Sequence, residues 1–233
     1  MGRDLRAASI TIVSLAACSA LESVEPTTAP HGAASPPGAP ALNARVLELI
    51  ATYPDGGFGG YRWPARRGTS GTTRDLAVGD DVVATGGDGN HCVGVTLEVF
   101  WRALDECPGG IAAALDARRA RAFKRTWYVP VDRGAGSAEA LPAFDLGERV
   151  AALDDARPGD FMQAWRADGL GHSMVFLGWQ RDERGVIVGV DYWSSQPWTD
   201  GLGRASTTIG IDDASFDPAQ VYLARARCPT VAR

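Results

Sequence analysis

Two short segments of this chain carry residues that could act together as a nucleophile and its base. The first is Gly-Asn-His-Cys-Val-Gly, which contains Cys92, and the second is Gly-His-Ser-Met-Val-Phe-Leu-Gly, which contains His172. A cysteine attacks a carbonyl carbon as the thiolate, and histidine is the side chain that most often accepts its proton. The two segments therefore predict a cysteine-dependent hydrolase.

Cys92 falls at the start of a predicted helix. Four apolar residues repeat at intervals of four, three and four and form one helical stripe that ends near Glu106, namely Val93, Leu97, Phe100 and Leu104. Asn90 is available as the N-cap of this helix. Unpaired backbone N–H groups and the positive end of the helix dipole favour a thiolate in the first turn, and they could also stabilise the oxyanion of a tetrahedral intermediate.

His172 is the best placed of the three histidines to act as the base. His31 lies in a proline-rich segment, and His91 is the direct neighbour of Cys92. Side chains one residue apart on a helix do not face each other, so His91 is expected at the surface where the helix starts. A histidine on a later strand can instead approach the first turn of the helix from across the fold.

A third polar side chain usually orients such a histidine. The apolar runs on either side of residues 181–185 predict a β-hairpin. A turn centred between residues 183 and 184 places Ser195 directly opposite His172 on the neighbouring strand, which makes Ser195 the expected third residue. The alternatives are Asp191, which shares the face of His172 and is chemically stronger, and, after a shift of one residue, Ser194 or Gln196.

The elements that position these residues change along the chain from helical to extended. Before residue 155 the patterns predict a helix at 42–53, irregular structure at 55–90, a second helical stretch at 110–124, a strand-like segment at 126–130, and a short helix with a connection at 138–152. After residue 160, runs rich in β-forming residues occur at 161–165, 172–179, 186–193 and 221–226. This order predicts an α+β domain in which helices pack on an antiparallel sheet.

The first residues have the layout of a secretory signal. Arg3 and Arg6 precede an apolar run at 7–17, which is too short to span a bilayer permanently. The run ends in Leu-Ala-Ala-Cys, which resembles the lipobox of bacterial lipoproteins, in which the cysteine, here Cys18, is lipidated. The resemblance implies a protein of the cell envelope anchored to a membrane by its lipid. Ser19, rather than an aspartate, after the cysteine suits the outer membrane, facing the periplasm.

A tether is expected between this signal and the folded domain. Residues 19–41 contain repeated prolines among alanine, serine, threonine and glycine, which do not form a packed element. The expected organisation is a signal peptide at 1–18, a tether at 19–41 and one folded domain at 42–233.

Three cysteines remain when Cys18 is set aside, and an odd number leaves one thiol unpaired in an oxidising compartment. The simplest assignment is a disulfide between Cys107 and Cys228, with Cys92 free. The other two pairings remain open from the sequence.

The composition is that of an ordinary globular protein, with 45% apolar and 22% charged residues. The net charge of -5 and the lack of an uninterrupted basic cluster argue against nucleic-acid binding. Gly86-Gly87-Asp88-Gly89 lacks the lysine and hydroxyl residue of a phosphate loop, and the cysteines and histidines do not have zinc-site spacing. We expect no metal, no cofactor and a monomer.

Cys92 at a helix start, Gly159-Asp160 before a strand, and Gly-His leading into an apolar strand that ends at Gly178 form one pattern. It resembles the papain-like cell-wall peptidases of the NlpC type and covers residues 90–200. The resemblance implies a papain-like fold in which the cysteine is the nucleophile, the histidine the base and a polar residue on the next strand the orienting group. Members commonly have Asp before and Ser after the cysteine, where this chain has His91 and Val93.

The family resemblance implies hydrolysis of amide bonds in the stem peptides of peptidoglycan or at its sugar-peptide junction. The expected substrate is a stem peptide or another peptide. Two other functions fit the same residues. A non-catalytic binding or structural lipoprotein of the envelope would keep the fold without using the thiol, and a cysteine acyltransferase would transfer the acyl group to an amine instead of water.

Overall fold

The computed structural model describes residues 41–65, 67–129 and 132–229. The chain divides into two units, Met1–Ala34 and Ser35–Arg233, and every described residue belongs to the second. The expected signal segment, Cys18 and the tether up to residue 40 therefore lie outside the described residues.

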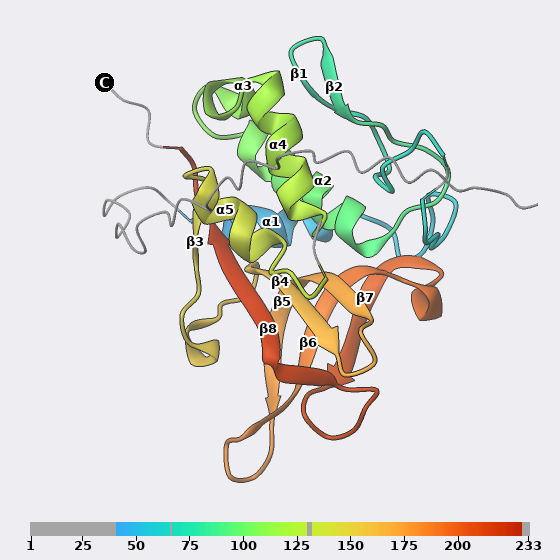
Figure 1. The fold of residues 1–233 in the computed structure, drawn as a ribbon, viewed down its shortest axis with the longest axis vertical. Helices are drawn as coiled ribbons and strands as arrows, with labels where there is room; N and C mark the ends of the chain where they lie inside the picture. The colour runs from blue at the N-terminus through green and yellow to red at the C-terminus, as the bar shows by residue number, and fades with distance from the viewer. Residues whose placement is uncertain (1–40, 66, 130–131, 230–233) are drawn as a thin grey trace, which may run out of the picture. The chain divides into compact units, whose positions relative to one another are not determined.

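Five α-helices occur in the described part of the chain, most of them on one side of the main sheet in Figure 1. They are α1 (Asn43–Ile50), α2 (Cys92–Asp105), α3 (Gly110–Ala114), α4 (Ala117–Trp127) and α5 (Ser137–Ala143). The apolar stripe predicted for α2 is buried as expected, because this helix packs against strands of the sheet on one side and against α1 and α4 on others. Within the described residues, no helix combines the length and apolarity that crossing a bilayer would require.

The single helix expected at 110–124 is two helices, and the strand expected at 126–130 is wrong. The chain leaves the helical conformation at Leu115, and the side chain of Asp116 then caps α4 by accepting a hydrogen bond from the backbone N–H of Arg119 at 2.8 Å. Helix α4 continues to Trp127, whose ring packs 5.2 Å from that of Phe100. Burial of this indole, which is 1% exposed, outweighs the local β preference of the segment.

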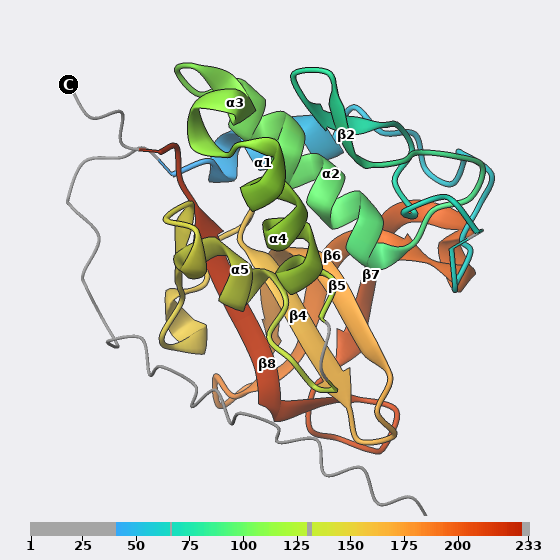
Figure 2. The same ribbon diagram turned by 45° about the horizontal axis from the view of Figure 1, so that its top comes forward.

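Eight strands among the described residues form two antiparallel sheets. A hairpin of β1 (Leu76–Val78) and β2 (Asp81–Ala84) lies in the segment expected to be irregular, on the helical side of the domain in Figure 2. The main sheet has the order β3-β8-β4-β5-β6-β7. Its strands are β3 (Gly147–Arg149), β4 (Phe161–Arg166), β5 (Gly171–Arg181), β6 (Ile187–Gln196), β7 (Gly201–Thr208) and β8 (Phe216–Ala226). The expected α+β class with an antiparallel sheet is confirmed.

The main sheet curls until the end of β7 lies beside the start of β8. Ile209, just after β7, pairs with Phe216 at the start of β8, and the N–H of Gly210 donates to the carbonyl of Phe216 at 2.9 Å. The register between β4 and β8 shifts between Ala164 and Arg166, where β8 bends sharply in Figure 1. The curled sheet encloses a second apolar cluster on its inner face, formed by Met162, Ala164, Met174, Phe176, Val190, Tyr192, Ile209, Phe216 and Leu223.

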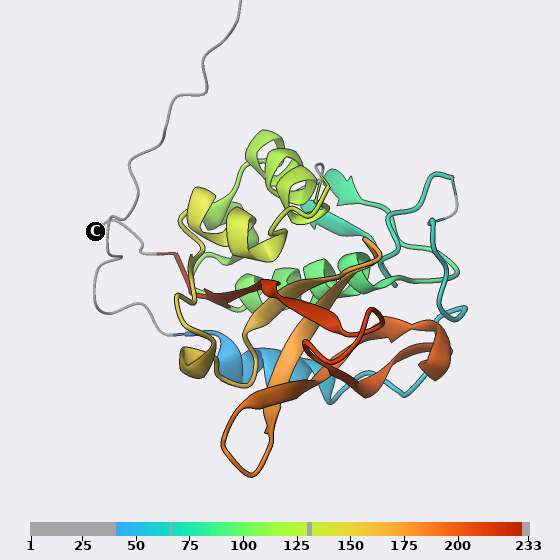
Figure 3. The same cartoon turned by 60° about the horizontal axis from the view of Figure 1, so that its bottom comes forward.

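The outer face of the sheet carries the helices and the larger core. Helix α2 packs along β5 and β6, and the green α2 crosses the orange strands in Figure 3. Because α2 is buried along nearly its whole length, its first residue is fixed against the sheet. A disulfide between Cys107 and Cys228, with an S–S distance of 2.03 Å, joins the segment after α2 to the segment after β8 and matches the expected pairing.

Gly159 and Asp160, which carried part of the family resemblance, form a structural anchor. Gly159 has a φ of +92°, and an added Cβ would lie 2.6 Å from the carbonyl oxygen of Asn43. The carboxylate of Asp160 is fully buried and accepts hydrogen bonds from Arg225 at 2.8 and 3.0 Å, from Asn43 and from the N–H of Arg157. This one carboxylate ties α1, the start of β4 and β8 together.

Candidate active site

A cavity of about 420 Å³ lies where α2 begins, β5 begins and β6 ends. Cys92 and His172 both line it, although 80 residues separate them in the chain. Gln196 lines it as well. The fold therefore brings the expected nucleophile and base to one cavity, together with one of the expected alternatives for the third residue.

Helix α2 begins at Cys92, but its N-cap is His91 rather than the expected Asn90. The Nδ1 atom of His91 accepts a hydrogen bond from the backbone N–H of Gly94 at 3.2 Å. The amide of Asn90 is used elsewhere, because its Nδ2 donates to the carbonyls of Gly57 and Phe58 at 3.3 Å each. His91 is 2% exposed and is thus not the surface residue expected from its position.

The thiol of Cys92 is protonated at neutral pH in the resting site. Burial raises its pKa, and the backbone N–H groups of Ser173, Val93 and Cys92 itself oppose this increase by hydrogen bonding to the sulfur. The contact with Ser173 places the sulfur beside the residue that follows His172. The same N–H groups are the local donors for a negative charge at this position.

His172 lies on β5 with its ring 5.4 Å from that of Tyr192 and 6.2 Å from that of Trp198. Burial lowers the pKa of His172 to about 4, and the side chain of Gln196 opposes the shift by favouring the protonated ring. The imidazole is therefore neutral at pH 7 and able to accept a proton.

The hairpin register differs from the expected one by one residue. Val175 pairs with Trp193 and Phe176 with Tyr192, so continuing the ladder brings His172 opposite Gln196. Asp182 accounts for this difference, because its Oδ1 accepts hydrogen bonds from the N–H groups at 184 and 186 and centres the turn on residue 184. Two bulges in the ladder, one on each strand, offset each other and leave this shift unchanged.

The prediction that Ser195 lies opposite His172 is therefore wrong. Its hydroxyl points to the carbonyl oxygen of Asn90 at 3.5 Å, and it lies on the other face of β6. Asp191 is also excluded as the orienting residue, because it pairs with Gly178 and accepts a hydrogen bond from Gln180 at 2.7 Å. Ser194 donates to the backbone carbonyl of Ser173 at 2.6 Å.

Two polar atoms at the base have no hydrogen-bond partner. The Nε2 atom of His172 and the Oε1 atom of Gln196 are both buried and unpaired among the described residues. Leaving a buried polar atom without a hydrogen bond costs about 1–3 kcal/mol. A small movement that pairs these two atoms would therefore be favourable. Gln196 Nε2 is held by Thr199 Oγ1 at 2.8 Å, which leaves its Oε1 as the free acceptor next to the imidazole.

Aromatic side chains form much of the remaining wall. Trp165 and Trp198 line the cavity, whereas Trp179 and Trp193 are packed in the two cores. Sequence reasoning missed further wall residues in two loop segments, namely Tyr61, Trp63 and Tyr128. Burial and the nearby Cys92 raise the pKa of Tyr61 to about 12.

A buried carboxylate that the sequence reasoning missed holds the loop with Tyr61 in place. Glu98 on α2 is fully buried and accepts hydrogen bonds at 2.7 Å from the hydroxyl of Tyr53 and from the N–H and hydroxyl of Thr73. Arg74 adds an ion pair at 3.2 Å. Because these contacts fall at both ends of the segment 53–74, they fix the wall of the cavity to the helix that carries Cys92.

No cluster of three or more potential metal ligands occurs within residues 41–65, 67–129 and 132–229. No protein-family model, curated protein or solved structure matches the chain. The chemistry of the site is therefore inferred from its own residues.

The buried cap predicts a specific loss of stability in acid. Burial lowers the pKa of His91 to about 4, while a histidine in an unfolded chain has a pKa near 6.5. The unfolded chain thus binds the proton more tightly, so the contribution of His91 is complete above pH 6.5 and declines as the pH falls toward 4. His91→Asn keeps a capping side chain and removes the titration.

Between pH 7.5 and pH 5, the free energy of unfolding of the wild-type protein should fall by about 2 kcal/mol more than that of His91→Asn. Urea titrations of both proteins at the two pH values measure this difference, and any packing change common to both values cancels. Equal drops in the variant and the wild-type protein would contradict a buried neutral His91.

Proposed function

We propose that the protein is a cysteine hydrolase that cleaves amide bonds of peptides. The supporting observation is that Cys92, the first residue of the buried helix α2, and His172 on β5 line one cavity. A neutral imidazole that lines the same cavity as a thiol whose sulfur faces backbone N–H groups supplies the parts needed for acyl transfer.

The arrangement supports a papain-like fold of the NlpC type as the finer class. A cysteine opens a helix that packs on an antiparallel sheet, the histidine lies on a strand of that sheet, and a polar residue, Gln196, lies on the next strand. The lipobox-like segment ending at Cys18 supports the cell envelope as the location of the proposed activity. Peptidoglycan stem peptides are the proposed substrate, and the lipid anchor is the proposed contact with the membrane.

The neutral resting pair defines the first step. In the proposed arrangement the Nε2–H of His172 donates to Oε1 of Gln196, which leaves the lone pair of the ring on Nδ1. As the sulfur of Cys92 attacks the substrate carbonyl carbon, its proton passes to Nδ1, and the backbone N–H groups around the sulfur stabilise the oxyanion.

Two further steps release the products and restore the enzyme. The protonated imidazole of His172 gives its proton to the amide nitrogen, the C–N bond breaks, and the acyl group remains on Cys92 as a thioester. Water, deprotonated by the imidazole, then attacks the thioester carbonyl and releases a carboxylic acid while the proton returns to the sulfur. An amine in place of water would give acyl transfer instead.

Purified peptidoglycan provides the direct test. Hydrolysis should release peptide fragments and new amino groups, which mass spectrometry and amine labelling detect, and adding a free amine should leave the products unchanged. Alkylation of Cys92 by iodoacetamide beforehand should prevent the release. Products that incorporate the added amine would indicate an acyltransferase.

Gln196 is predicted to position the imidazole. Gln196→Ala should lower kcat by about tenfold or more with a smaller change in KM, because the ring loses the acceptor that fixes its orientation. Gln196→Glu places a carboxylate beside His172, which raises the pKa of the imidazole and moves the acid limb of the kcat/KM profile to higher pH.

Ser195→Ala is the matched control on the neighbouring position of β6. Its hydroxyl contacts Asn90 and not His172, so its pH profile should follow that of the wild-type protein. A shifted profile in Ser195→Ala together with an unshifted one in Gln196→Glu would reassign the third residue to Ser195.

The burial of Cys92 favours a second candidate, a non-catalytic envelope protein of the same fold. Cys92 is 9% exposed and the pKa of its thiol is raised, as for an inert core cysteine. The two functions differ in the partner that the thiol needs. In the hydrolase, His172→Ala should slow iodoacetamide labelling of Cys92 at pH 7, whereas in a binding protein the labelling should be slow with or without His172.

A further inference from the structure

The cavity contains a single cationic side chain. Among its described lining residues, Arg166 is the only one with a full charge at neutral pH, and none is an aspartate or glutamate. Most of the other lining residues are apolar or aromatic, including Leu170, Trp198 and Phe216. A cation beside such surfaces attracts an anion more strongly than it would in open solvent.

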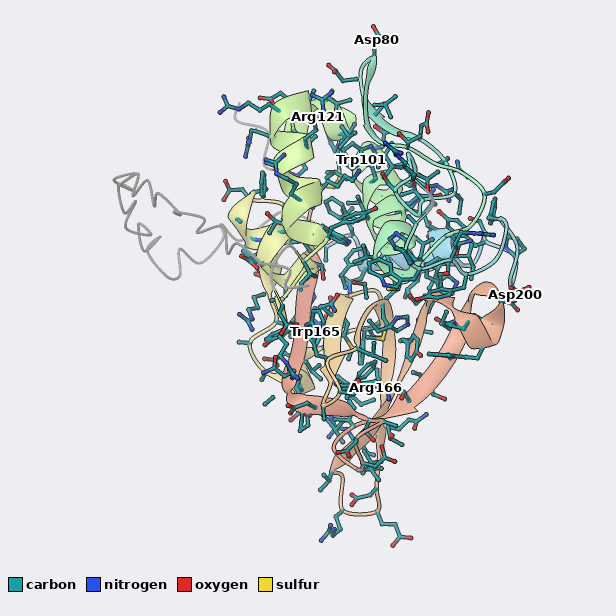
Figure 4. The ribbon with its side chains drawn as sticks, turned by 45° about the vertical axis from the view of Figure 1, so that its right-hand side comes forward. Asp80, Trp101, Arg121, Trp165, Arg166 and Asp200 are labelled. Carbon is teal, nitrogen blue, oxygen red and sulfur yellow. A yellow bond between two sulfur atoms is a disulfide. The ribbon has the colours of Figure 1, made fainter. Side chains whose placement is uncertain are left out.

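The structure holds Arg166 in a defined place at the end of β4. Its backbone N–H donates to the carbonyl of Leu170 at 2.9 Å, and its carbonyl accepts from the N–H of Gly169 at 3.0 Å, which closes the hairpin to β5. Trp165 before it is fixed by a hydrogen bond from its Nε1 to the carbonyl of Gly134 at 2.9 Å. Figure 4 labels Trp165 and Arg166 on this part of the sheet.

The guanidinium has unused hydrogen-bonding capacity. One terminal nitrogen forms an ion pair with Asp168 at 2.7 Å. The Nε atom is buried and has no partner in the described part of the chain. A buried charged donor without an acceptor is costly, and a carboxylate can accept from Nε and a terminal nitrogen at once.

Two carboxylates of the protein lie close to Arg166, and neither lines the cavity. Asp168 is 40% exposed, so its pair with Arg166 is largely screened by water. Asp212 is fully exposed, and its pKa is lowered mainly by hydrogen bonds from Ser215 and in smaller part by Arg166. The positive charge is therefore shared with carboxylates outside the cavity, and no described residue that lines the cavity is an anion.

We propose that Arg166 binds a carboxylate of the substrate and so determines specificity at the site. The inference rests on the proposed function, because it takes Cys92 as the atom that reacts. The favoured substrate is an acidic peptide that carries a free carboxylate beside the scissile amide, and its amidated counterpart should bind less well.

Thiol reagents of graded length test this inference without a known substrate. The probes are bromoacetyl-glycine, bromoacetyl-β-alanine and bromoacetyl-γ-aminobutyrate, each compared with its carboxamide, and mass spectrometry follows alkylation of Cys92. For at least one length, the acid should react about tenfold faster than the amide, with a rate that saturates, since a charge-assisted hydrogen bond contributes about 1.5 kcal/mol. Arg166→Met should abolish this preference, and Arg166→Lys should retain part of it.

Arg181→Met is the matched control, since Arg181 forms a surface ion pair with Asp154 and does not line the cavity. It should leave the ratio of acid to amide rates unchanged. Asp168→Asn should keep the preference for the acid or increase it, because it removes a competing carboxylate.

The outcomes separate this inference from the proposed hydrolase. If the amides label Cys92 but the ratio of acid to amide rates is the same in Arg166→Met and the wild-type protein, Arg166 is not the carboxylate site and the hydrolase proposal is unaffected. If no probe labels Cys92 in the folded protein, both are overturned. A preference for the acid that Arg181→Met also removes would show a general effect of charge and overturn the inference.

Discussion

Cys92→Ala is expected to abolish amide hydrolysis, lowering kcat on peptidoglycan fragments by about 10³-fold or more, because no other group in the cavity can form the thioester. KM should change little, since the aromatic walls and the cation of the cavity are retained. The release of new amino groups over time measures the rate. Cys92→Ser should be nearly as inactive, because a hydroxyl is a far weaker acid than a thiol and burial makes the imidazole of His172 a weak base by lowering its pKa.

The fold must be shown to survive in these variants. Cys92 is at the helix start and contributes one small side chain to the core, so circular dichroism and the unfolding midpoint should stay close to those of the wild-type protein. Cleavage by Cys92→Ala at the wild-type rate would refute the assignment of the nucleophile and leave the non-catalytic or another catalytic function.

Asp160→Ala is expected to lower the free energy of unfolding by about 3–5 kcal/mol. The substitution leaves the guanidinium of Arg225, which is 11% exposed, without its buried partner, and removes acceptors for the N–H of Arg157 and the amide of Asn43. Urea unfolding monitored by tryptophan fluorescence measures the loss. Hydrolysis per folded molecule should persist, because Asp160 does not line the cavity.

Asp154→Ala is the control for breaking an arginine pair at the surface. Its partner is Arg181 and its side chain is 75% exposed, so the expected loss is below about 1 kcal/mol. Asp160→Asn should fall between the two, because it keeps some hydrogen bonds and loses the charge. Equal small losses for Asp160→Ala and Asp154→Ala would show that the buried pair is not an anchor.

The parts of the site that depend on local pattern could be predicted from the sequence. The apolar spacing after Cys92 is a property of one helix, and it located the start of α2 to within two residues. The choice of His172 depended on counting histidines rather than on distance. The α+β class followed from the change along the chain from apolar residues at helical spacing to runs of β-forming residues.

The third residue could not be predicted because a hairpin register is set by details that a pattern does not contain. Two side-chain hydrogen bonds to Asp182 centre the turn on residue 184 and so move the partner of His172 from Ser195 to Gln196, while the two bulges in the ladder offset each other. Each bulge adds a residue on one strand, and a shift of one residue reverses every side chain across the sheet.

Strand β7 was missed for a different reason. Its sequence, Gly201–Thr208, has glycine, serine and threonine in place of a regular apolar alternation, and it lies at the edge of the sheet, where one side needs no partner. The capping role of His91 was missed because its burial depends on contacts made by residues 63 and 128 from other segments.

The position of β8 also sets the order in which the cavity can be completed during synthesis. This strand enters the sheet between β3 and β4, although it follows every other strand in the chain. It supplies Phe216 to the wall of the cavity and Arg225 to Asp160. A chain that has emerged only as far as residue 215 thus contains Cys92 and His172 but lacks one wall and the ion pair that fixes β4. The folded site is therefore available only after translation has passed β8, well after the nucleophile and the base have been made.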